Sequence, residues 1–363
     1  MLRSRRSPGA DVTVTRPTQM LTQMFVEASE AAAVVRAQLA ANHALMADLG
    51  ARLRQMQPRA VVTIGRGSSD HAATFAQYLI ETRLSVLTSS AAPSVSSLYN
   101  ATPDMEGVAC LAISQSGKSP DLLGAIEGAK AAGAFVIALV NDETSPVAKL
   151  ADAVVPLGAG PELSVAATKS YLATLSAIVQ LVAAWTEDAD LETALSTLPD
   201  QMTQAWACDW SVGVNLLTDA ANLYVVGRGL GFAVAQEAAL KFKETCGLHA
   251  EAFSAAEVRH GPMALVGTGF PVLAFAQNDQ SRAGVDELVT EFVSRGADVL
   301  LAGGEATLAS RPGFRRLATL DAHPVIEPIL YAQSFYRMVN DLALARGFDP
   351  DRPPHLNKVT ETV

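Results

Sequence analysis

Acidic, basic and imidazole side chains cluster in one short segment of the second half of the sequence. Lys241, Lys243 and Glu244 lie together at the end of a helical pattern, and His260 follows a few turns later. An acid, a base and a cation in one segment are the groups that proton-transfer chemistry needs. Charged residues at a helix end are usually a solvated surface, and a single histidine usually caps or packs. The clustering nevertheless favours a catalytic interpretation of the segment.

A second candidate segment, in the first half of the chain, is rich in hydroxyl groups. Ser114-Gln115-Ser116-Gly117-Lys118-Ser119 follows an apolar run, and Pro120 then opens a helical pattern. Hydroxyl donors, free backbone N–H groups and the positive end of a helix together suit a phosphate dianion. An ordinary serine N-cap followed by proline would look similar. The loop Gly67-Ser68-Ser69 follows the preceding apolar run and adds further hydroxyls.

The sequence repeats itself with a constant shift. Gly65 and Gly67 recur as Gly227 and Gly229, each 162 residues later, and Leu111–Gln115 recurs as Leu273–Gln277 at the same shift. The second copy of the serine-rich segment differs, because it reads Ala276-Gln277-Asn278-Asp279 and so gains a carboxylate. A loop needed only for capping has no reason to change in this way. We therefore expect an internal duplication in which the first copy binds phosphate and the second has another role.

Short apolar runs alternate with helical patterns in both copies, which predicts parallel βαβ units with helices on both faces of each sheet. The predicted strands are continuously apolar, as a sheet buried on both faces requires. We expect amphipathic helices over 24–54 and a long helix over 168–186 that packs across the two halves. The predicted linker is Asp188–Pro199. The predicted strands are Val61–Ile64, Val108–Ile113, Phe135–Val140, Ala153–Pro156, Leu223–Val226, Pro271–Phe275, Val299–Ala302 and a run near Val325.

The predicted fold class is therefore α/β, with two tandem, doubly wound, mainly parallel sheets of flavodoxin-like topology related by a pseudo-twofold duplication. A chain of 363 residues, 49% of them hydrophobic, can bury two cores. The predicted organisation is a disordered extension over 1–23, helices and the first domain over 24–190, the second domain over 205–346, and a tail over 347–363.

Composition excludes several classes of protein. A formal net charge of −10 argues against nucleic acid or an anionic membrane as the main partner. The three cysteines are far apart and show no metal-ligand spacing, so we expect no metal and a reducing, cytoplasmic location. The two Gly-Arg-Gly segments begin like a dinucleotide motif, but Asp70 and Phe232 stand where the third glycine belongs. We therefore expect no cofactor.

These motifs resemble the sugar isomerase (SIS) superfamily, specifically the isomerase half of glutamine–fructose-6-phosphate amidotransferase. The resemblance covers the chain from about Met24 onward. The segments that carry it are Ser114–Gly117, Val165–Lys169, Ala239–Glu244, Glu257–Pro262 and Leu356–Lys358.

The resemblance implies roles for individual residues. Glu244 would move a proton between C1 and C2 of the sugar, and Lys241 could stabilise the intermediate. His260, contributed by the other subunit of a homodimer, would open the sugar ring, and Lys358 would assist. The phosphate would be held by Ser69, Ser114, Gln115, Ser116 and Ser119, while Val165, Ala167 and Asn357 would line the sugar site.

The family's synthases carry an N-terminal glutaminase domain with a nucleophilic cysteine, whereas no cysteine precedes Cys110 here. We therefore expect a phosphosugar enzyme that deaminates glucosamine 6-phosphate to fructose 6-phosphate. Two alternatives stay open. One is a relative acting on galactosamine 6-phosphate or on a fructosamine-type sugar phosphate. The other is a non-enzymatic sugar-phosphate sensor, which would need phosphate binding but no base.

Overall fold

The computed structural model describes residues 21–99, 101, 103–305 and 311–358, so most of the predicted extension over 1–23 lies outside it. Two five-stranded sheets form, and every strand pairing is parallel. The first sheet has the order β2-β1-β3-β4-β5 and the second the order β10-β9-β8-β6-β7. Both orders are the flavodoxin-like one. The predicted fold class is confirmed.

The strand bounds follow the apolar runs closely. They are β1 (Ala60–Ile64), β2 (Thr88–Ser90), β3 (Val108–Ser114), β4 (Phe135–Val140), β5 (Ala153–Pro156), β6 (Asn222–Gly227), β7 (His249–Ser254), β8 (Pro271–Ala276), β9 (Asp298–Gly303) and β10 (Phe314–Leu317).

The duplication extends to the register of the central strand pair. Ile64 lies opposite Ala112 in the first sheet, and Val226 lies opposite Ala274 in the second. Both pairs are related by the same shift of 162 residues that the sequence shows. The two copies therefore share strand order and strand register as well as motif spacing.

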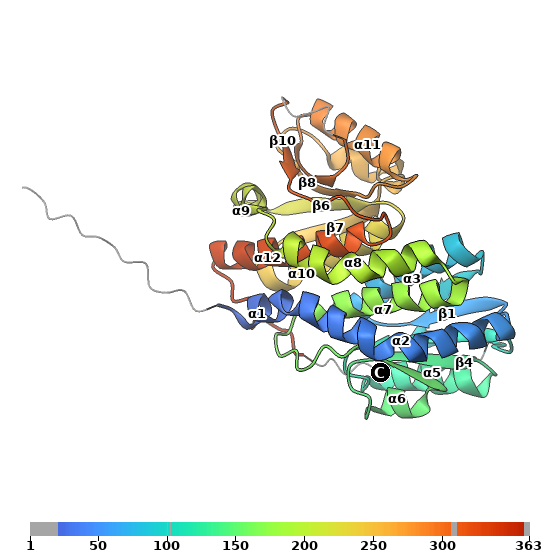
Figure 1. Cartoon of the computed structure of the whole chain (residues 1–363). Helices are drawn as coiled ribbons and strands as arrows, with labels where there is room; N and C mark the ends of the chain where they lie inside the picture. The colour runs from blue at the N-terminus through green and yellow to red at the C-terminus, as the bar shows by residue number, and fades with distance from the viewer. Residues whose placement is uncertain (1–20, 100, 102, 306–310, 359–363) are drawn as a thin grey trace, which may run out of the picture.

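Helices cover the sheets on both faces. They are α1 (Gln23–Ser29), α2 (Ala31–Met56), α3 (Ser68–Leu84), α4 (Pro93–Ser97), α5 (Pro120–Ala131), α6 (Pro146–Leu150), α7 (Lys169–Thr186), α8 (Ala189–Trp206), α9 (Ser211–Leu217), α10 (Leu230–Cys246), α11 (Arg282–Ser294) and α12 (Glu327–Ala345), with 3₁₀ turns η1 (Glu257–His260) and η2 (Pro262–Leu265). Helices α2, α3, α7, α8, α10 and α12 form a layer between the two sheets, while α5 and α6 cover the outer face of the first (Figure 1).

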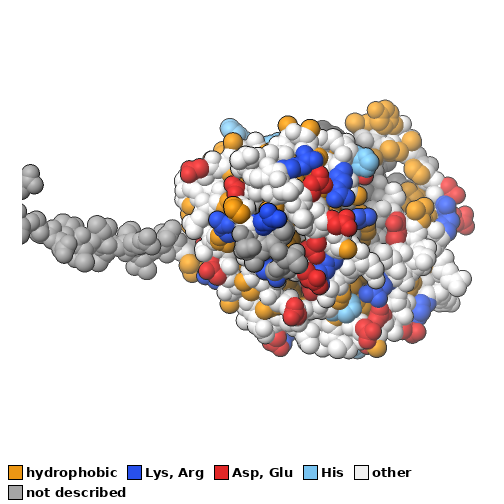
Figure 2. Space-filling view, turned by 90° about the horizontal axis from the view of Figure 1, so that it is seen from above, with side chains coloured by type: hydrophobic (Ala, Val, Ile, Leu, Met, Phe, Trp, Pro, Cys, Tyr) orange, Lys and Arg blue, Asp and Glu red, His pale blue; other side chains and the backbone are white. Residues whose placement is uncertain are grey.

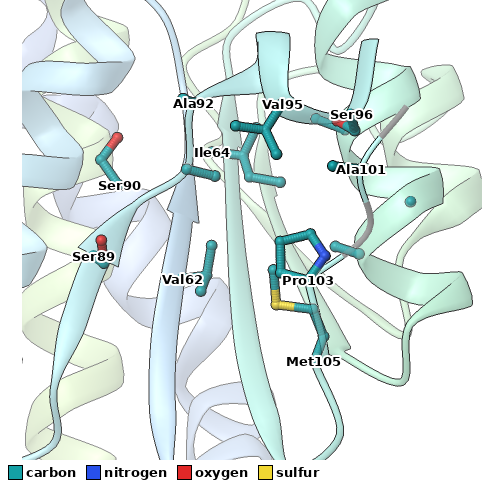
Figure 3. A pocket seen from close by; sticks show the side chains of 14 residues that line it. Val62, Ile64, Ser89, Ser90, Ala92, Val95, Ser96, Ala101, Pro103 and Met105 are labelled. Carbon is teal, nitrogen blue, oxygen red and sulfur yellow. The ribbon is translucent and has the colours of Figure 1, made fainter. Parts of the chain in front are cut away.

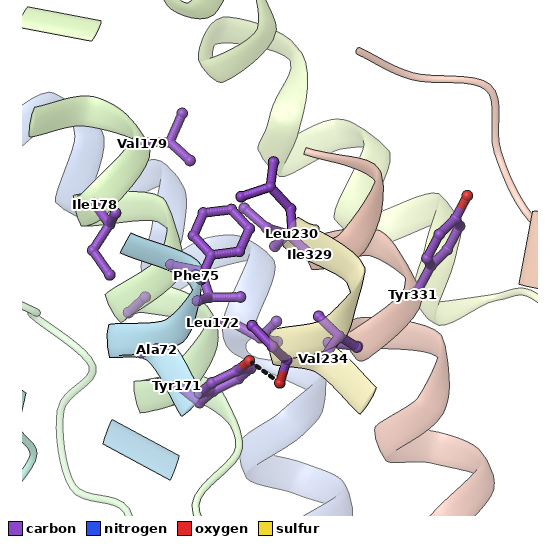
Figure 4. Packing of buried hydrophobic residues seen from close by; sticks show 14 of the residues in the cluster. Ala72, Phe75, Tyr171, Leu172, Ile178, Val179, Leu230, Val234, Ile329 and Tyr331 are labelled. Atoms are coloured by element: carbon purple, nitrogen blue, oxygen red, sulfur yellow. Dashed lines mark hydrogen bonds between the residues drawn. The ribbon is translucent and has the colours of Figure 1, made fainter. Parts of the chain in front are cut away.

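This middle layer has a single hydrophobic core that belongs to both halves. Phe75 of α3, Val179 of α7, Val234 of α10 and Ile329 of α12 are all fully buried in it. Figure 4 shows these helices packed together, with the hydroxyl of Tyr171 donating to the carbonyl of Ala233 at 3.3 Å. The predicted long helix that packs across the halves is confirmed as α7.

Two predictions were wrong. The predicted linker, Asp188–Pro199, is the start of α8, with Asp188 as its N-cap and Pro199 inside the helix. Leu191, Leu195 and Leu198 give that segment a buried apolar face, so packing overrides the proline. The run near Val325 is not a strand but leads into α12, where Pro328 stands in the first turn. The outer strand is β10 instead.

Glycine lets each first helix start close to its strand. A Cβ on Gly65 would lie 2.9 Å from the carbonyl oxygen of Ser69, and one on Gly227 would lie 2.3 Å from that of Gly231. Any side chain at either position would push α3 or α10 away from its sheet. The two glycines thus fix where the loops after β1 and β6 stand.

Candidate functional site

The serine-rich segment lies where β3 ends and α5 begins, next to the end of β1. Ser114 is buried, and its hydroxyl accepts a hydrogen bond from the backbone N–H of Gly117 at 3.0 Å. Gly117 has φ +63°, and a Cβ there would lie 2.3 Å from the hydroxyl oxygen of Ser145. Only glycine fits this turn. The turn brings Ser119 to the N-cap of α5, with Pro120 in the first turn.

Four polar side chains around this turn remain available to a ligand. Ser69, Gln115, Ser116 and Ser119 are partly exposed. Within the described part of the chain, none of these side chains has a hydrogen-bond partner. Ser119, although at the N-cap position, makes no capping bond. Hydroxyls that cap a helix would be occupied, so the capping explanation of this loop does not hold.

The equivalent place in the second copy is closed by its own side chains. Gln277 is fully buried, and its amide nitrogen donates to the carbonyl of Arg228 at 2.7 Å. It also donates to Asp279 at 3.1 Å and to Ser281 at 3.0 Å. In the first copy the corresponding Gln115 makes no such bond to a described residue. The carboxylate gained in the second copy thus helps to fill the place that stays open in the first.

Three ionisable residues lie on one face of α10. The ammonium of Lys241 is 2.6 Å from Oε2 of Glu244 and 3.2 Å from Oε1 of Glu237. Lys241 and Glu237 are almost fully buried, whereas the side chain of Glu244 is 19% exposed. Although burial opposes it, the two carboxylates raise the pKa of Lys241. The solvated-surface explanation fails for Lys241, and Glu244 is the member of the group that solvent can reach.

Glu237 ties this face to the first half of the chain and to α12. Its carboxylate lies 2.9 Å from Nδ1 of His71 and accepts from Ser68 at 3.1 Å, both on α3. It also accepts from the hydroxyl of Tyr336 at 3.1 Å. Burial alone raises the pKa of Glu237, but Lys241, His71 and Ser68 outweigh burial and lower it to about 2. Glu237 is therefore a fixed anion.

The tail folds back onto the loop before α7. The ammonium of Lys358 donates to the carbonyl of Ser164 at 2.8 Å and lies 3.4 Å from Oε2 of Glu162. Buried Glu162 organises this loop, because it accepts from the backbone N–H groups of Thr168 and Ser170 at 3.0 and 3.1 Å. Val165 and Ala167 lie in the same loop and are partly exposed.

A cavity of about 360 Å³ joins α10 to the tail, lined by Leu240, Lys243, Glu244, Gly247, Phe348, Pro354 and Leu356. Ser68 accepts from Lys241 at 3.2 Å, so the start of α3 meets the same helix. The structure thus links Glu244 and Lys241 with the loop after β1 on one side and with the tail on the other.

Not every predicted site residue is part of this arrangement. His260 lies on η1, exposed, and its side chain makes no hydrogen bond to another described residue. Asn357 is exposed as well. The sequence interpretation overlooked Glu237 and Glu162. Glu237 could have been found, because it precedes Lys241 by four residues and Glu244 by seven and so shares their helix face. Glu162 is a lone acidic residue in a loop, and no pattern marks it.

A second cavity, of about 210 Å³, lies between α4, α5 and the first sheet. Figure 3 shows its wall of Val62, Ile64, Val95 and Met105, with Ser89 and Ser90 at one side. None of the predicted site residues lines it. Its lining is mostly apolar, with Ser89, Ser90 and Ser96 as its polar side chains, and it is separate from the phosphate loop predicted from the sequence.

The described residues give no sign of a metal or membrane site. They contain no group of three or more His, Cys, Asp or Glu side chains placed to hold a metal ion. No helix among them is long and apolar enough to cross a membrane. Viewed from above, the molecule shows acidic and basic side chains interspersed rather than separated into patches (Figure 2).

Comparison with known proteins gives a family match. A family model described as SIS domain matches residues 56–184 and 216–305. A glutamine–fructose-6-phosphate aminotransferase (isomerizing) of Aeropyrum pernix is 33% identical over 319 residues, which are 84% of this chain and 51% of that protein. The chain spans about half the length of the curated relatives that it matches.

Solved structures are similar over almost the whole chain. A candidate phosphosugar isomerase of Silicibacter pomeroyi is 40% identical, with a TM-score of 0.85 over 91% of this chain and 100% of that one. A glucosamine-6-phosphate deaminase of Thermotoga maritima is 22% identical, with a TM-score of 0.73 over 94% of this chain and 100% of that one. The second likeness shows a shared fold.

Proposed function

The chain belongs to the SIS domain family, and from this premise we propose that it is a phosphosugar isomerase that releases ammonia from an amino sugar phosphate. The substrate is glucosamine 6-phosphate, and with one water it gives fructose 6-phosphate and ammonia. The observation that carries the proposal is the pair of Lys241 and Glu244, a buried cation 2.6 Å from a carboxylate that solvent can reach.

The pair suits the isomerisation step. Glu244 takes the proton from C2 of the open-chain sugar and returns it to C1, so that a 2-amino aldose becomes a 2-imino ketose. The negative charge that develops between the two transfers is stabilised by Lys241, which Glu237 holds in place. Water then adds to the imine carbon, and the carbon–nitrogen bond breaks to release ammonia.

The phosphate-binding part of the proposal rests on the first copy of the repeat. Ser69, Gln115, Ser116 and Ser119 offer donors that no described residue uses, at the carboxyl ends of adjacent parallel strands. Lys358 lies beside the loop that contains Val165 and Ala167, where it would assist ring opening. His260, exposed in its own chain, would complete the site of a second subunit in a homodimer.

The choice of an amino sugar comes from the relatives. The Aeropyrum pernix protein is named for moving an amino group from glutamine to fructose 6-phosphate with isomerisation. In the present chain Cys110 and Cys246 are buried, and Cys208 lies outside the site just described. We therefore assign to this chain only the reaction at the sugar. That reaction interconverts the amino aldose and the ketose with release or uptake of ammonia.

The deciding experiment measures ammonia and fructose 6-phosphate formed from glucosamine 6-phosphate in the absence of glutamine, with galactosamine 6-phosphate in parallel. Formation of both products from the first sugar supports the proposal. Turnover of galactosamine 6-phosphate alone would move the assignment to the other epimer. Binding of both sugars without any turnover would support a sensor and contradict the proposal.

A further inference from the structure

The side chain of Arg66 reaches from the loop after β1 to the start of α5, beside the candidate phosphate loop. It stands between Gly65 and Gly67 directly after β1. Its Nε and Nη2 atoms are each 2.9 Å from Oδ2 of Asp121, in the first turn of α5. Because β1 and β3 are neighbours, this ion pair spans the gap between the loop after β1 and the helix after β3.

The two partners of this ion pair are in different environments. The side chain of Asp121 is 2% exposed, whereas that of Arg66 is 54% exposed. A guanidinium has five N–H donors in a planar fork, and the hydrogen bond from Nε to Asp121 uses one of them, with Nη2 in ion-pair contact with the same oxygen. No other side-chain hydrogen bond joins Arg66 to a described residue, and about half of its side chain is open to solvent. A planar fork of this kind matches the oxygen atoms of a phosphate.

Arg66 also neutralises the negative charge of Asp121. A carboxylate in the first turn of α5 interacts favourably with the helix dipole, but it would repel a phosphate bound at the same helix end. Arg66 cancels that charge while keeping donors free. The first copy can therefore hold an anion at a helix end that carries its own buried carboxylate.

The second copy contains an equivalent arginine, but the place beside it is already filled by other side chains. Arg228 stands 162 residues after Arg66, again between two glycines after the first strand of its sheet. There the backbone carbonyl of Arg228 is bound by Gln277, and Nη1 of Arg228 lies 2.8 Å from where a Cβ on Gly284 would stand. Its guanidinium packs against α11 beside a place already filled by Gln277, Asp279 and Ser281.

We propose that Arg66, in the loop after β1, is an anion-binding residue. It holds the phosphate of the substrate and so selects phosphorylated over free sugars. The inference rests on the proposed function for the identity of the substrate, but anion binding itself does not need catalysis. On binding, the donors of Arg66 that Asp121 does not engage bond the phosphate oxygens.

The test uses inorganic phosphate as the probe and the full chain, with affinity measured by calorimetry. Arg66→Gln should weaken phosphate binding by about tenfold or more, consistent with losing a charge-assisted contact. Arg228→Gln, the matched change in the second copy, should leave the affinity within about twofold of wild type.

Asp121 separates anion binding from a purely structural role. Arg66→Gln and Asp121→Asn both break the ion pair, so a structural role predicts that both weaken phosphate binding. The proposal predicts that Asp121→Asn keeps or strengthens binding, because Arg66 is then fully available. If Arg66→Gln folds poorly, the Arg66→Gln/Asp121→Asn double variant, which leaves no unpaired carboxylate, should still lose phosphate affinity.

The outcomes distinguish this inference from the proposed function. Loss of phosphate binding in Arg66→Gln with no ammonia formed by wild type would support the inference and contradict the reaction. Ammonia formation together with unchanged phosphate affinity in Arg66→Gln would overturn the inference and leave the reaction standing. A wild-type chain that binds no phosphate would also overturn it.

Discussion

The ammonium of Lys241 lies 2.6 Å from Oε2 of Glu244, three residues further along α10. This contact holds a positive charge beside a carboxylate that remains partly open to solvent. Lys241 has a second, buried carboxylate partner in Glu237, 3.2 Å away. The proposed reaction, in which Glu244 exchanges a proton with the sugar, leaves Lys241 with Glu237 as a carboxylate partner throughout.

Glu244→Gln should lower turnover of glucosamine 6-phosphate by a factor of about 10² to 10⁴, since the amide cannot accept the C2 proton. Affinity for the phosphosugar should stay within a few-fold, because the phosphate loop is untouched. The steady-state rate and a binding measurement on the same variant check both statements. Glu127→Gln, at an exposed position on α5, is the control. Normal turnover in Glu244→Gln would contradict the mechanism.

The double variant Ser116→Ala/Ser119→Ala should mainly raise KM and leave kcat within a few-fold. Both hydroxyls are partly exposed and have no partner among the described residues, so their removal should cost binding rather than stability. Ser281→Ala changes the residue equivalent to Ser119 in the second copy, where the hydroxyl serves Gln277. That control should leave KM unchanged. An equal rise in KM in both variants would argue against a division of roles between the copies.

Glu237→Gln should destabilise the fold by about 3 kcal/mol at pH 7, because buried Lys241 then loses one of its two carboxylates. Burial raises the pKa of Glu237, but Lys241, His71 and Ser68 together lower it from the usual 4.5 to about 2. A lowered pKa means that the stabilisation is complete above pH 4.5 and is lost as the pH falls toward 2.

Urea unfolding at several pH values tests this statement. The free energy of unfolding of wild type should fall between pH 4.5 and 2 more steeply than that of Glu237→Gln. Parallel curves for the two proteins would show that Glu237 is not held as a fixed anion.

If His260 acts across subunits, mixing two inactive variants should restore activity. A dimer of one Glu244→Gln chain and one His260→Ala chain has one site with both residues intact, so random mixing should recover about one quarter of wild-type activity. Refolding the two variants together and assaying ammonia release measures the recovery. If the mixture stays inactive while each variant still forms dimers, His260 does not act in this way.

The sequence predicted strands well where they are continuously apolar. Phe135–Val140 and Ala153–Pro156 match β4 and β5 residue for residue. The missed strands are edges. β2 has only three residues, and β7 alternates exposed and covered positions over His249–Glu251, so neither shows a long apolar run. β7 lies between Glu244 and His260, inside the segment in which the sequence clusters acidic, basic and imidazole side chains.

For the site, types and spacing pointed to the serine loop and to α10, but not to their partners. Arg66 and Glu162 are single charged residues next to glycine and proline, and their meaning comes from Asp121 and from the backbone N–H groups around Thr168. Arg66 and Asp121 are far apart in the chain, and Glu162 meets its partners through the fold of its own loop. Only the packed fold brings them within hydrogen-bond distance.

The hydrophobic core shared by α3, α7, α10 and α12 has a consequence for how the molecule melts. Phe75 and Val234 are buried in the same cluster although they come from different copies of the repeat. If one copy unfolds, the other copy therefore loses apolar contacts and its buried side chains become exposed to water. Heating should therefore give one calorimetric transition whose van't Hoff and calorimetric enthalpies agree, and a chain divided between α8 and α9 should yield two halves that fold only when mixed.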